Sequence, residues 1–242
     1  GSIPNHRLLK NLQLQDNYLS NDGDNEGLSI NALGETSLKP APYALQFDGT
    51  NEYVECGDIN AIEGVAAISI GLWVYFDVLG VAHDLVTKGQ YATSGSSWVV
   101  SVDSNNRIQF SIGASPYGWI APGFAVKTWY HFIATYSNAT DDIDFYLNGT
   151  ALSEPLTAET GFGDIDVPAT TKTVKIGSSY SSNYFQGRIR DVALWDVALD
   201  AAAVTALYNS GDSIDLSADS GDYDNSGDLV AYWKMDEGTG TS

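Results

Sequence analysis

From residue 44 onward the chain is a succession of short apolar runs separated by Gly, Asn, Asp and Ser. Several runs alternate at period two: within 67–77, Ile68, Ile70 and Leu72 fall on one face and Trp73 on the other. Short alternating runs with turn residues between them are typical of a β-sandwich or barrel. The runs that we expect to be strands are 44–48, 52–56, 67–77, 84–88, 97–102, 107–112, 129–136, 143–148, 173–177, 186–196 and 228–235.

One segment has a helical pattern instead. Asp200 can cap the sequence "DAAAVTALYNSG", Val204, Leu207 and Tyr208 form an apolar stripe, and Gly211 follows the end. In an otherwise all-β chain, we expect this short helix to be a lid on one end of the sandwich.

The beginning of the chain differs from the rest. It is polar, with short Leu and Ile alternations broken by Asn, Asp and Gly. It is similar to the repeated β-segments of phage tail fibres and other filamentous adhesins, whose strands stack between chains; a flexible linker is the alternative. Gly1 and Ser2 look like an expression scar, so we expect a piece of a longer protein. We therefore predict an N-terminal segment over 1–43 and a domain over 44–242.

Charge restricts the possible partners. The chain has 31 acidic and 11 basic side chains, a formal net charge of −20. Nucleic acid and anionic membranes attract Lys/Arg patches, so we expect neither nucleic-acid binding nor membrane insertion. A surface of this sign suits solvation, divalent cations or a salty medium. The single cysteine, Cys56, cannot form an internal disulfide, and we expect a buried, unreactive thiol.

Several motifs follow one another in a characteristic order: "FDGTNEYVECGD", "AAISIGLWVYFD", "LVTKGQ", "WYHFIATYSNATDDIDFYLNGT", and "GRIRDVALWDVAL" before the helix. Together they resemble the laminin-G-like, pentraxin-related domain of the concanavalin A-like lectin/glucanase superfamily, over about 44–240. The resemblance implies an all-β fold, an antiparallel two-sheet jelly-roll sandwich with one short helix. It does not fix the function, because this sandwich carries lectins, hydrolases, adhesion modules and spacers.

The sequence gives little support to catalysis. Retaining glycosidases need two carboxylates about 5–5.5 Å apart, and the superfamily's hydrolases carry a Glu-x-Asp-x-x-Glu type run that this sequence lacks. Glu52 and Glu55 are at an odd spacing, which sends them to opposite faces. Asp142 and Asp144 share a face at the entry of a hairpin, and we interpret them as solvated. We therefore predict that the protein is not an enzyme.

Sugar binding has better support. Pyranose rings stack on flat aromatic side chains while a few polar groups fix the hydroxyls. The Gly/Pro-rich segment 113–123 carries Tyr117 and Trp119, and we expect it to be a surface loop. Further candidates from two other loops are Tyr180, Asn183 and Tyr184 within 177–187, and Lys88 and Tyr91 within "TKGQYATSG". For each aromatic residue, the alternative is that it folds back on the core.

In the segment "ALQFDGTNEYVECGD", the run Asp48-Gly49-Thr50-Asn51 divides two strand-like halves. Turn residues in this position indicate a hairpin. The family resemblance also implies a calcium ion, since superfamily members often hold one where an early strand meets the last. Here that would bring Asp48 toward Asp236, and calcium prefers six to eight oxygen ligands. The rival site is "DYDNSGD", with Asp222 and Asp224, for which a plain acidic loop is the alternative.

We therefore predict a non-catalytic, lectin-like module of a larger extracellular, cell-surface or virion protein, which binds calcium and polysaccharide or cell-surface glycan. The alternative is a structural or adhesion module that contacts protein, or forms a homo-oligomer through its N-terminal segment, without binding glycan. Retention by glycans, compared with the size of the protein in solution, separates the two.

Overall fold

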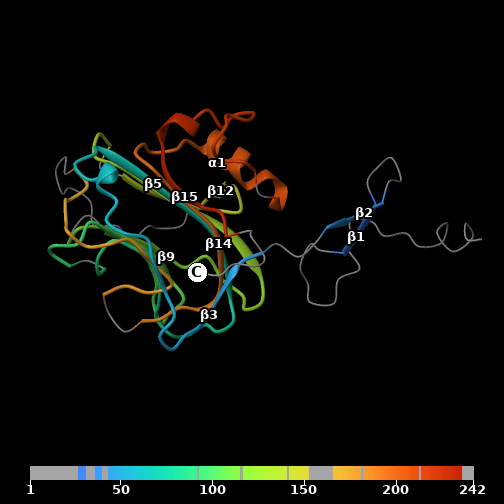
Figure 1. The fold of residues 1–242 in the computed structure, drawn as a ribbon, viewed down its shortest axis with the longest axis horizontal. Helices are drawn as coiled ribbons and strands as arrows, with labels where there is room; N and C mark the ends of the chain where they lie inside the picture. The colour runs from blue at the N-terminus through green and yellow to red at the C-terminus, as the bar shows by residue number, and fades with distance from the viewer. Residues whose placement is uncertain are drawn as a thin grey trace, which may run out of the picture. The chain divides into compact units, whose positions relative to one another are not determined.

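The computed structural model describes residues 27–30, 36–39, 43–91, 93–114, 117–140, 142–152, 166–180, 183–212 and 214–235. The chain divides into two units, Gly1–Tyr43 and Ala44–Ser242 (Figure 1). In the first unit, β1 (Gly27–Ile30) pairs antiparallel with β2 (Thr36–Lys39). No helix in the described part of the chain is long and apolar enough to cross a membrane.

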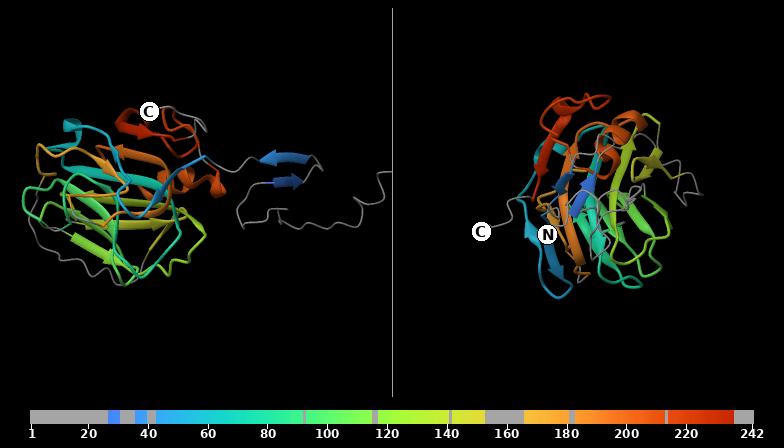
Figure 2. Two further views of the ribbon diagram at one scale, coloured as in Figure 1. Left: turned by 60° about the horizontal axis from the view of Figure 1, so that its bottom comes forward. Right: turned by 90° about the vertical axis from the view of Figure 1, so that its right-hand side faces the viewer.

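The second unit is a sandwich of two antiparallel sheets (Figures 1 and 2), which confirms the predicted fold class. One sheet has seven strands, in the order β12-β11-β10-β5-β14-β15 with β3 also paired to β14. These are β3 (Leu45–Asp48), β5 (Ala67–Phe76), β10 (Trp129–Ser137), β11 (Asp142–Leu147), β12 (Thr150–Ala151), β14 (Gln186–Trp195) and β15 (Leu229–Trp233).

The other sheet has six strands, in the order β4-β13-β6-β7-β8-β9. These are β4 (Val54–Glu55), β6 (His83–Thr87), β7 (Trp98–Val102), β8 (Ile108–Ile112), β9 (Tyr117–Ile120) and β13 (Lys175–Ile176). Short 3-10 segments, η3 (Asn60–Ile62), η4 (Asn209–Gly211) and η5 (Ser226–Asp228), lie in the connections.

Period-two alternation builds the core between the sheets. Alternate residues of β5 are fully buried in one cluster with side chains from the six-stranded sheet. The cluster includes Ile68, Ile70, Leu72, Val74, Phe76, Trp98 and Phe110. Removing apolar surface from water contributes about 25 cal/mol per Å², so this inner layer is the main source of stability.

The helix α1 (Ala201–Tyr208) covers the outer face of the seven-stranded sheet. Its N-cap is as predicted, since Asp200 Oδ1 accepts a hydrogen bond of 2.8 Å from the Ala203 N–H. Val204 and Leu207 pack in a second cluster with Trp195 of β14. The expectation that the helix closes one end of the sandwich is therefore wrong. The outer face of this sheet is itself apolar, and the helix buries it.

The turn after Asp48 does not join a hairpin. β3 pairs with β14 in the seven-stranded sheet, whereas β4 pairs with β13 in the six-stranded sheet. The chain therefore crosses from one sheet to the other at Gly49, whose φ of +78° favours glycine. The thiol of Cys56, just after β4, is partly buried, and burial together with Glu55 raises its pKa to about 12. A thiol with this pKa is unreactive at neutral pH.

His131 lies on the outer face of the seven-stranded sheet, beneath the helix. Its ring centroid is 5.0 Å from that of Trp73 and 6.0 Å from that of Tyr208. Burial, followed by the nearby positive charge of Arg190, lowers the pKa of His131 to about 3. The imidazole is therefore neutral in the folded protein across the physiological range.

The low pKa of His131 predicts a loss of stability in acid. Between pH 6.5 and about 3, the unfolded chain takes up a proton at this histidine that the folded protein does not. At pH 4 this lowers the free energy of unfolding by about 3 kcal/mol relative to neutral pH. His131→Phe keeps a ring in contact with Trp73 and Tyr208 and removes the titration. Urea melts at pH 7 and pH 4 should show a smaller acid effect in the variant; equal effects in both proteins contradict the prediction.

Candidate functional site

Several of the predicted sugar-binding residues lie on or beside the outer face of the six-stranded sheet. Its strand register brings one residue of each strand into a continuous row on this face. The row is Glu55, Lys175, Thr87, Val99, Ser111 and Tyr117. Its middle is covered, because Thr87, Val99 and Ser111 are fully buried. The accessible parts of the face are therefore its two edges.

The segment before β14 covers the outer face at β6. Thr87 Oγ1 donates a hydrogen bond of 3.0 Å to the Ser178 carbonyl, and Ser179 Oγ donates one of 2.5 Å to Asp84 Oδ2. The Asp84 N–H donates to the Asn183 carbonyl at 3.0 Å. The backbone of Asn183 is therefore fixed beside the start of β6, and Tyr184, which follows it, is partly buried.

At the β4–β13 edge, four side chains form what we call the aromatic–lysine patch: Tyr53, Lys172, Lys175 and Tyr180. The two tyrosines are 42% and 38% exposed, and they belong to the few large hydrophobic side chains that are exposed among the described residues. Lys175 Nζ lies 4.6 Å from the ring centroid of Tyr53 and 4.4 Å from that of Tyr180. Lys172 Nζ lies 4.3 Å from the centroid of Tyr180. All three contacts are within the range of cation–π attraction.

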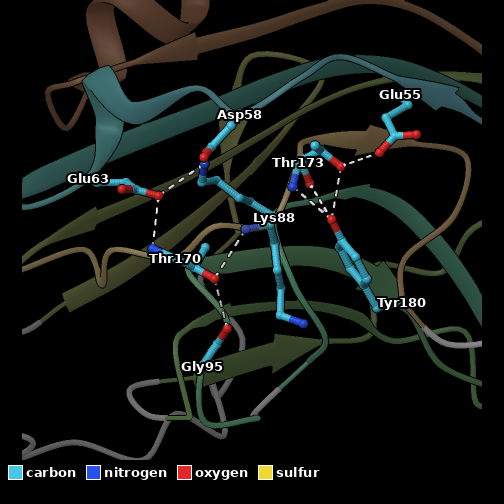
Figure 3. A network of polar contacts seen from close by, with 9 residues as sticks. Glu55, Asp58, Glu63, Lys88, Gly95, Thr170, Thr173 and Tyr180 are labelled. Carbon is cyan, nitrogen blue, oxygen red and sulfur yellow. Dashed lines mark hydrogen bonds and ion pairs between the residues drawn. The ribbon is translucent and has the colours of Figure 1, made fainter.

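Local hydrogen bonds hold the patch in place (Figure 3). The Thr173 N–H donates to the Tyr180 hydroxyl at 2.7 Å, and the two hydroxyl oxygens are 2.9 Å apart. Thr173 Oγ1 donates to Glu55 Oε1 at 2.7 Å, which ties β13 to β4. Tyr53 precedes Glu55 by two residues on an extended segment, so both project to the same side.

Lys88 lies in a neighbouring, buried network (Figure 3). Its ammonium pairs with Asp58, and with Glu63 Oε1 at 3.0 Å, while its side chain has no exposed surface. Glu63 Oε1 also accepts from the Thr170 N–H at 3.0 Å, and Thr170 Oγ1 donates to the Gly95 carbonyl. The structure thus places the lysine in a stabilising ion-pair network, away from solvent, so we leave it out of the proposed site.

Trp119 lies at the opposite edge of the sheet. Residues Tyr117–Ile120 form the edge strand β9 paired with β8, so the expectation of a loop over 113–123 is wrong for this part. The Arg107 guanidinium lies 4.0 Å from the centre of the Trp119 ring, and its Nε donates to Asp103 Oδ2 at 2.6 Å. The backbone of Tyr117 is in β9, and its side chain lies outside the described residues.

The candidate residues therefore divide into separate groups. β13 and β9 are four strands apart in the sheet order, which corresponds to roughly 19 Å at about 4.8 Å per strand. Tyr91, partly buried, lies in the connection between β6 and β7, where its carbonyl accepts a hydrogen bond of 2.9 Å from Thr93 Oγ1. A single rim that gathers all the candidates is not formed. Which group binds sugar stays a prediction.

Sequence reasoning found Tyr180 and missed the other members of the patch. Tyr53 stands in a segment that we interpreted as one half of a hairpin, and β13 is only two residues long. One signal was present: Lys172 and Lys175 stand close together in a chain with few basic residues.

Calcium binding stays a prediction. Asp48 is exposed, its Oδ1 accepts from the Thr50 N–H at 2.7 Å, and its own N–H donates to Glu52 Oε2 at 2.8 Å. The hydrogen bond from Thr50 to Asp48 closes an Asx turn, so this carboxylate oxygen already has a partner within the turn. Among the described residues there is no group of three His, Cys, Asp or Glu side chains able to hold a metal ion. Asp236 lies outside the described residues.

The rival calcium segment folds as an ordinary loop. Asp222 and Asp224 are both exposed. Tyr223 between them is fully buried and anchors the segment in the outer cluster. The described residues therefore give neither segment a set of ligands that fits calcium, and we derive no function from it.

Comparison with known proteins agrees with this architecture. Residues 48–205 match the family described as the concanavalin A-like lectin/glucanases superfamily, in its laminin-G form. The match covers more than half of the chain, so the protein belongs to this superfamily. A search among curated proteins gave no significant match.

Solved structures show the same fold at low sequence identity. A carbohydrate-binding protein of Bacteroides ovatus, described as putative in that structure's own name, is 14% identical with a TM-score of 0.60, over 85% of this chain and 55% of that one. A heptameric SAP-like pentraxin of Limulus polyphemus is 16% identical with a TM-score of 0.55, over 69% and 82%. The CBM40 of a Ruminococcus gnavus IT-sialidase, bound to α2,3 sialyllactose, is 9% identical with a TM-score of 0.54, over 69% and 96%. The chain thus spans about half the length of the Bacteroides protein.

Proposed function

We propose that the protein is a carbohydrate-binding module whose ligand contacts the aromatic–lysine patch. The observation that carries this proposal is the pair of half-exposed tyrosine rings, Tyr53 and Tyr180, bridged by Lys175 at one edge of the sheet. Aromatic side chains exposed together beside polar groups provide the apolar surface and hydrogen bonds that a sugar requires. The carbohydrate-binding proteins among the similar structures support the same function.

We further propose that the module is non-catalytic. Asp142 and Asp144 alternate with the buried Ile143 of β11, so they share the outer face of the seven-stranded sheet. Partial burial, and then the charge of Asp142, raise the pKa of Asp144. A raised pKa is a property of a glycosidase acid. However, both carboxylates are exposed, and they belong to the sheet opposite the patch.

Affinity electrophoresis in gels containing neutral and acidic polysaccharides tests the binding site. We expect Tyr53→Ala to weaken retention by roughly tenfold, since one aromatic contact contributes about 1.5 kcal/mol. Tyr53→Phe is the matched control: it keeps the ring and should keep most of the retention. Trp119→Ala removes the aromatic residue at the opposite edge and should leave retention unchanged.

Three results would contradict the proposal. Absence of retention by every polysaccharide would rule out the carbohydrate-binding function. Loss of retention in Trp119→Ala, with Tyr53→Ala unaffected, would move the site to the β9 edge. Release of reducing ends by the purified protein, at a rate that Asp144→Asn reduces, would show that the module is catalytic.

A further inference from the structure

Three basic side chains of this acidic protein are paired with carboxylates in the described part of the chain. Lys88 pairs with Asp58 and Glu63, Arg107 with Asp103, and Arg190 with Asp191. Such pairing is expected for a chain with 31 acidic and 11 basic residues. In a chain with so many acidic side chains, a cluster of cations without acidic partners is a local concentration of positive charge.

Lys172 and Lys175 form such a cluster. Within the described ranges, neither ammonium has a carboxylate oxygen within 4.0 Å. Both lie over the same ring, at 4.3 Å and 4.4 Å from the centroid of Tyr180, so they are at most about 9 Å apart. Like charges at this separation repel each other, and the electron-rich face of the tyrosine partly offsets the repulsion.

The surrounding structure holds this arrangement in place before any ligand arrives. Tyr180 is fixed through its hydroxyl by Thr173, and Lys175 belongs to β13, which is paired on both sides with β4 and β6. The cross-strand partner of Lys175 is the acidic residue Glu55. Its Oε1 accepts the Thr173 hydroxyl, and it balances only one of the two lysines. The patch therefore keeps a net positive charge.

We propose that the aromatic–lysine patch selects acidic glycans, which carry carboxylate or sulfate groups. This inference rests on the proposed carbohydrate-binding function. The two ammonium groups supply charge-assisted hydrogen bonds to the acidic groups, and the exposed ring of Tyr53 supports a neighbouring sugar ring. Tyr180, whose ring lies against both lysines, acts as a positioning residue for the cations.

Isothermal titration of the whole chain with three probes tests the selectivity: oligomers of galacturonic acid, sulfated dextran and neutral galactan oligomers. We expect at least one acidic probe to bind about tenfold more tightly than the neutral one at low salt. Its affinity should fall as sodium chloride rises, because salt screens exposed charges. The carboxylated and sulfated probes distinguish the two sources of acidic groups.

Substitutions of single lysines test whether the preference for acidic probes comes from the aromatic–lysine patch. Lys172→Gln and Lys175→Gln should each weaken the preferred acidic probe by roughly two- to fivefold, the range for exposed ion pairs, and the double variant by about tenfold. Lys127→Gln removes the same charge from an exposed site between β9 and β10 and should have no effect. Lys172→Arg keeps the charge and should retain binding. Circular dichroism of each variant confirms that it is folded.

Two outcomes would overturn the inferred selectivity for acidic glycans while leaving the proposed carbohydrate-binding function intact. If neutral galactan binds as tightly as both acidic probes, the patch does not select charge, although carbohydrate binding stands. The same conclusion follows if the double lysine variant binds the acidic probe as the parent does. If none of the three probes binds and gel retention is also absent, the proposed function and this inference fall together.

Discussion

Lys88→Ala is expected to lower the free energy of unfolding by about 3 kcal/mol, because breaking a buried ion pair leaves its partners without a counter-charge. The Lys88 side chain is fully buried, whereas the side chains of Asp58 and Glu63 are 35% and 12% exposed. Asp58 can therefore turn toward water after the substitution. Glu63 remains in a largely buried position, beside the Thr170 N–H. For this reason, the expected decrease in the free energy of unfolding is at the lower end of the range for breaking a buried ion pair.

Urea denaturation followed by tryptophan fluorescence measures this effect. Lys88→Met keeps most of the apolar stem of the lysine, so the difference between the Met and Ala variants separates lost packing from lost charge. The matched control is Lys172→Met, which removes a lysine without a carboxylate partner in the described part of the chain and should change stability by less than about 0.5 kcal/mol. Equal stability of Lys88→Ala and the parent would contradict a structural role for this network.

Trp195→Ala is expected to destabilise the protein by about 3–5 kcal/mol, the range for removing a large core aromatic residue. Trp195 is 1% exposed and lies between the seven-stranded sheet and the helix. Its indole ring packs over Gly71 of β5, where an added Cβ would lie 3.1 Å from the ring. Its Nε1 donates to the Tyr223 hydroxyl at 3.0 Å, which in turn donates to the Leu216 carbonyl at 2.9 Å. The substitution therefore removes both packing and a hydrogen-bond chain.

Two milder variants separate the contribution of packing from that of the hydrogen-bond chain. Trp195→Phe keeps a ring at this position and removes the indole N–H, and Tyr223→Phe removes the hydroxyl that accepts it. A buried donor without an acceptor costs about 1–3 kcal/mol, so Tyr223→Phe should be destabilising by that amount. In a domain of this size, 1 kcal/mol shifts the melting temperature by about 2–4 °C. If Trp195→Ala melts within that interval of the parent, the outer cluster does not contribute as described.

The local sequence pattern was sufficient to predict a strand or a helix where the environment of the side chains repeats at regular intervals along the segment. β5, β10 and β14 were predicted within a few residues, because long alternating segments have one face against the core at every second residue. The helix was predicted for a similar reason, since the capping bond of Asp200 is made within the segment itself. β9 was missed, because Gly118 and the flanking Gly and Pro residues indicate a loop, and only pairing with β8 makes it a strand.

The sequence pattern could not predict which strands pair with one another. The halves on either side of Asp48 look like a hairpin, yet β3 and β4 pair with strands more than a hundred residues away, in different sheets. The same limit affected the candidate site. Tyr53 and Tyr180 are brought together only because β4 pairs with β13. Lys88 resembles a surface lysine in sequence, but the 3-10 segment η3 and its neighbours enclose it.

Local pattern and composition were enough to predict the all-β class, the long strands of the sandwich core, the capped helix and the acidic surface. These properties depend on contacts between residues close in the chain, or on composition alone. The tertiary structure decided which sheet each strand joins, which face the helix covers, and that two tyrosines and two lysines meet at one edge of the six-stranded sheet. Those properties depend on hydrogen bonds and packing between distant segments, whose pairing is set by the free energy of the whole fold.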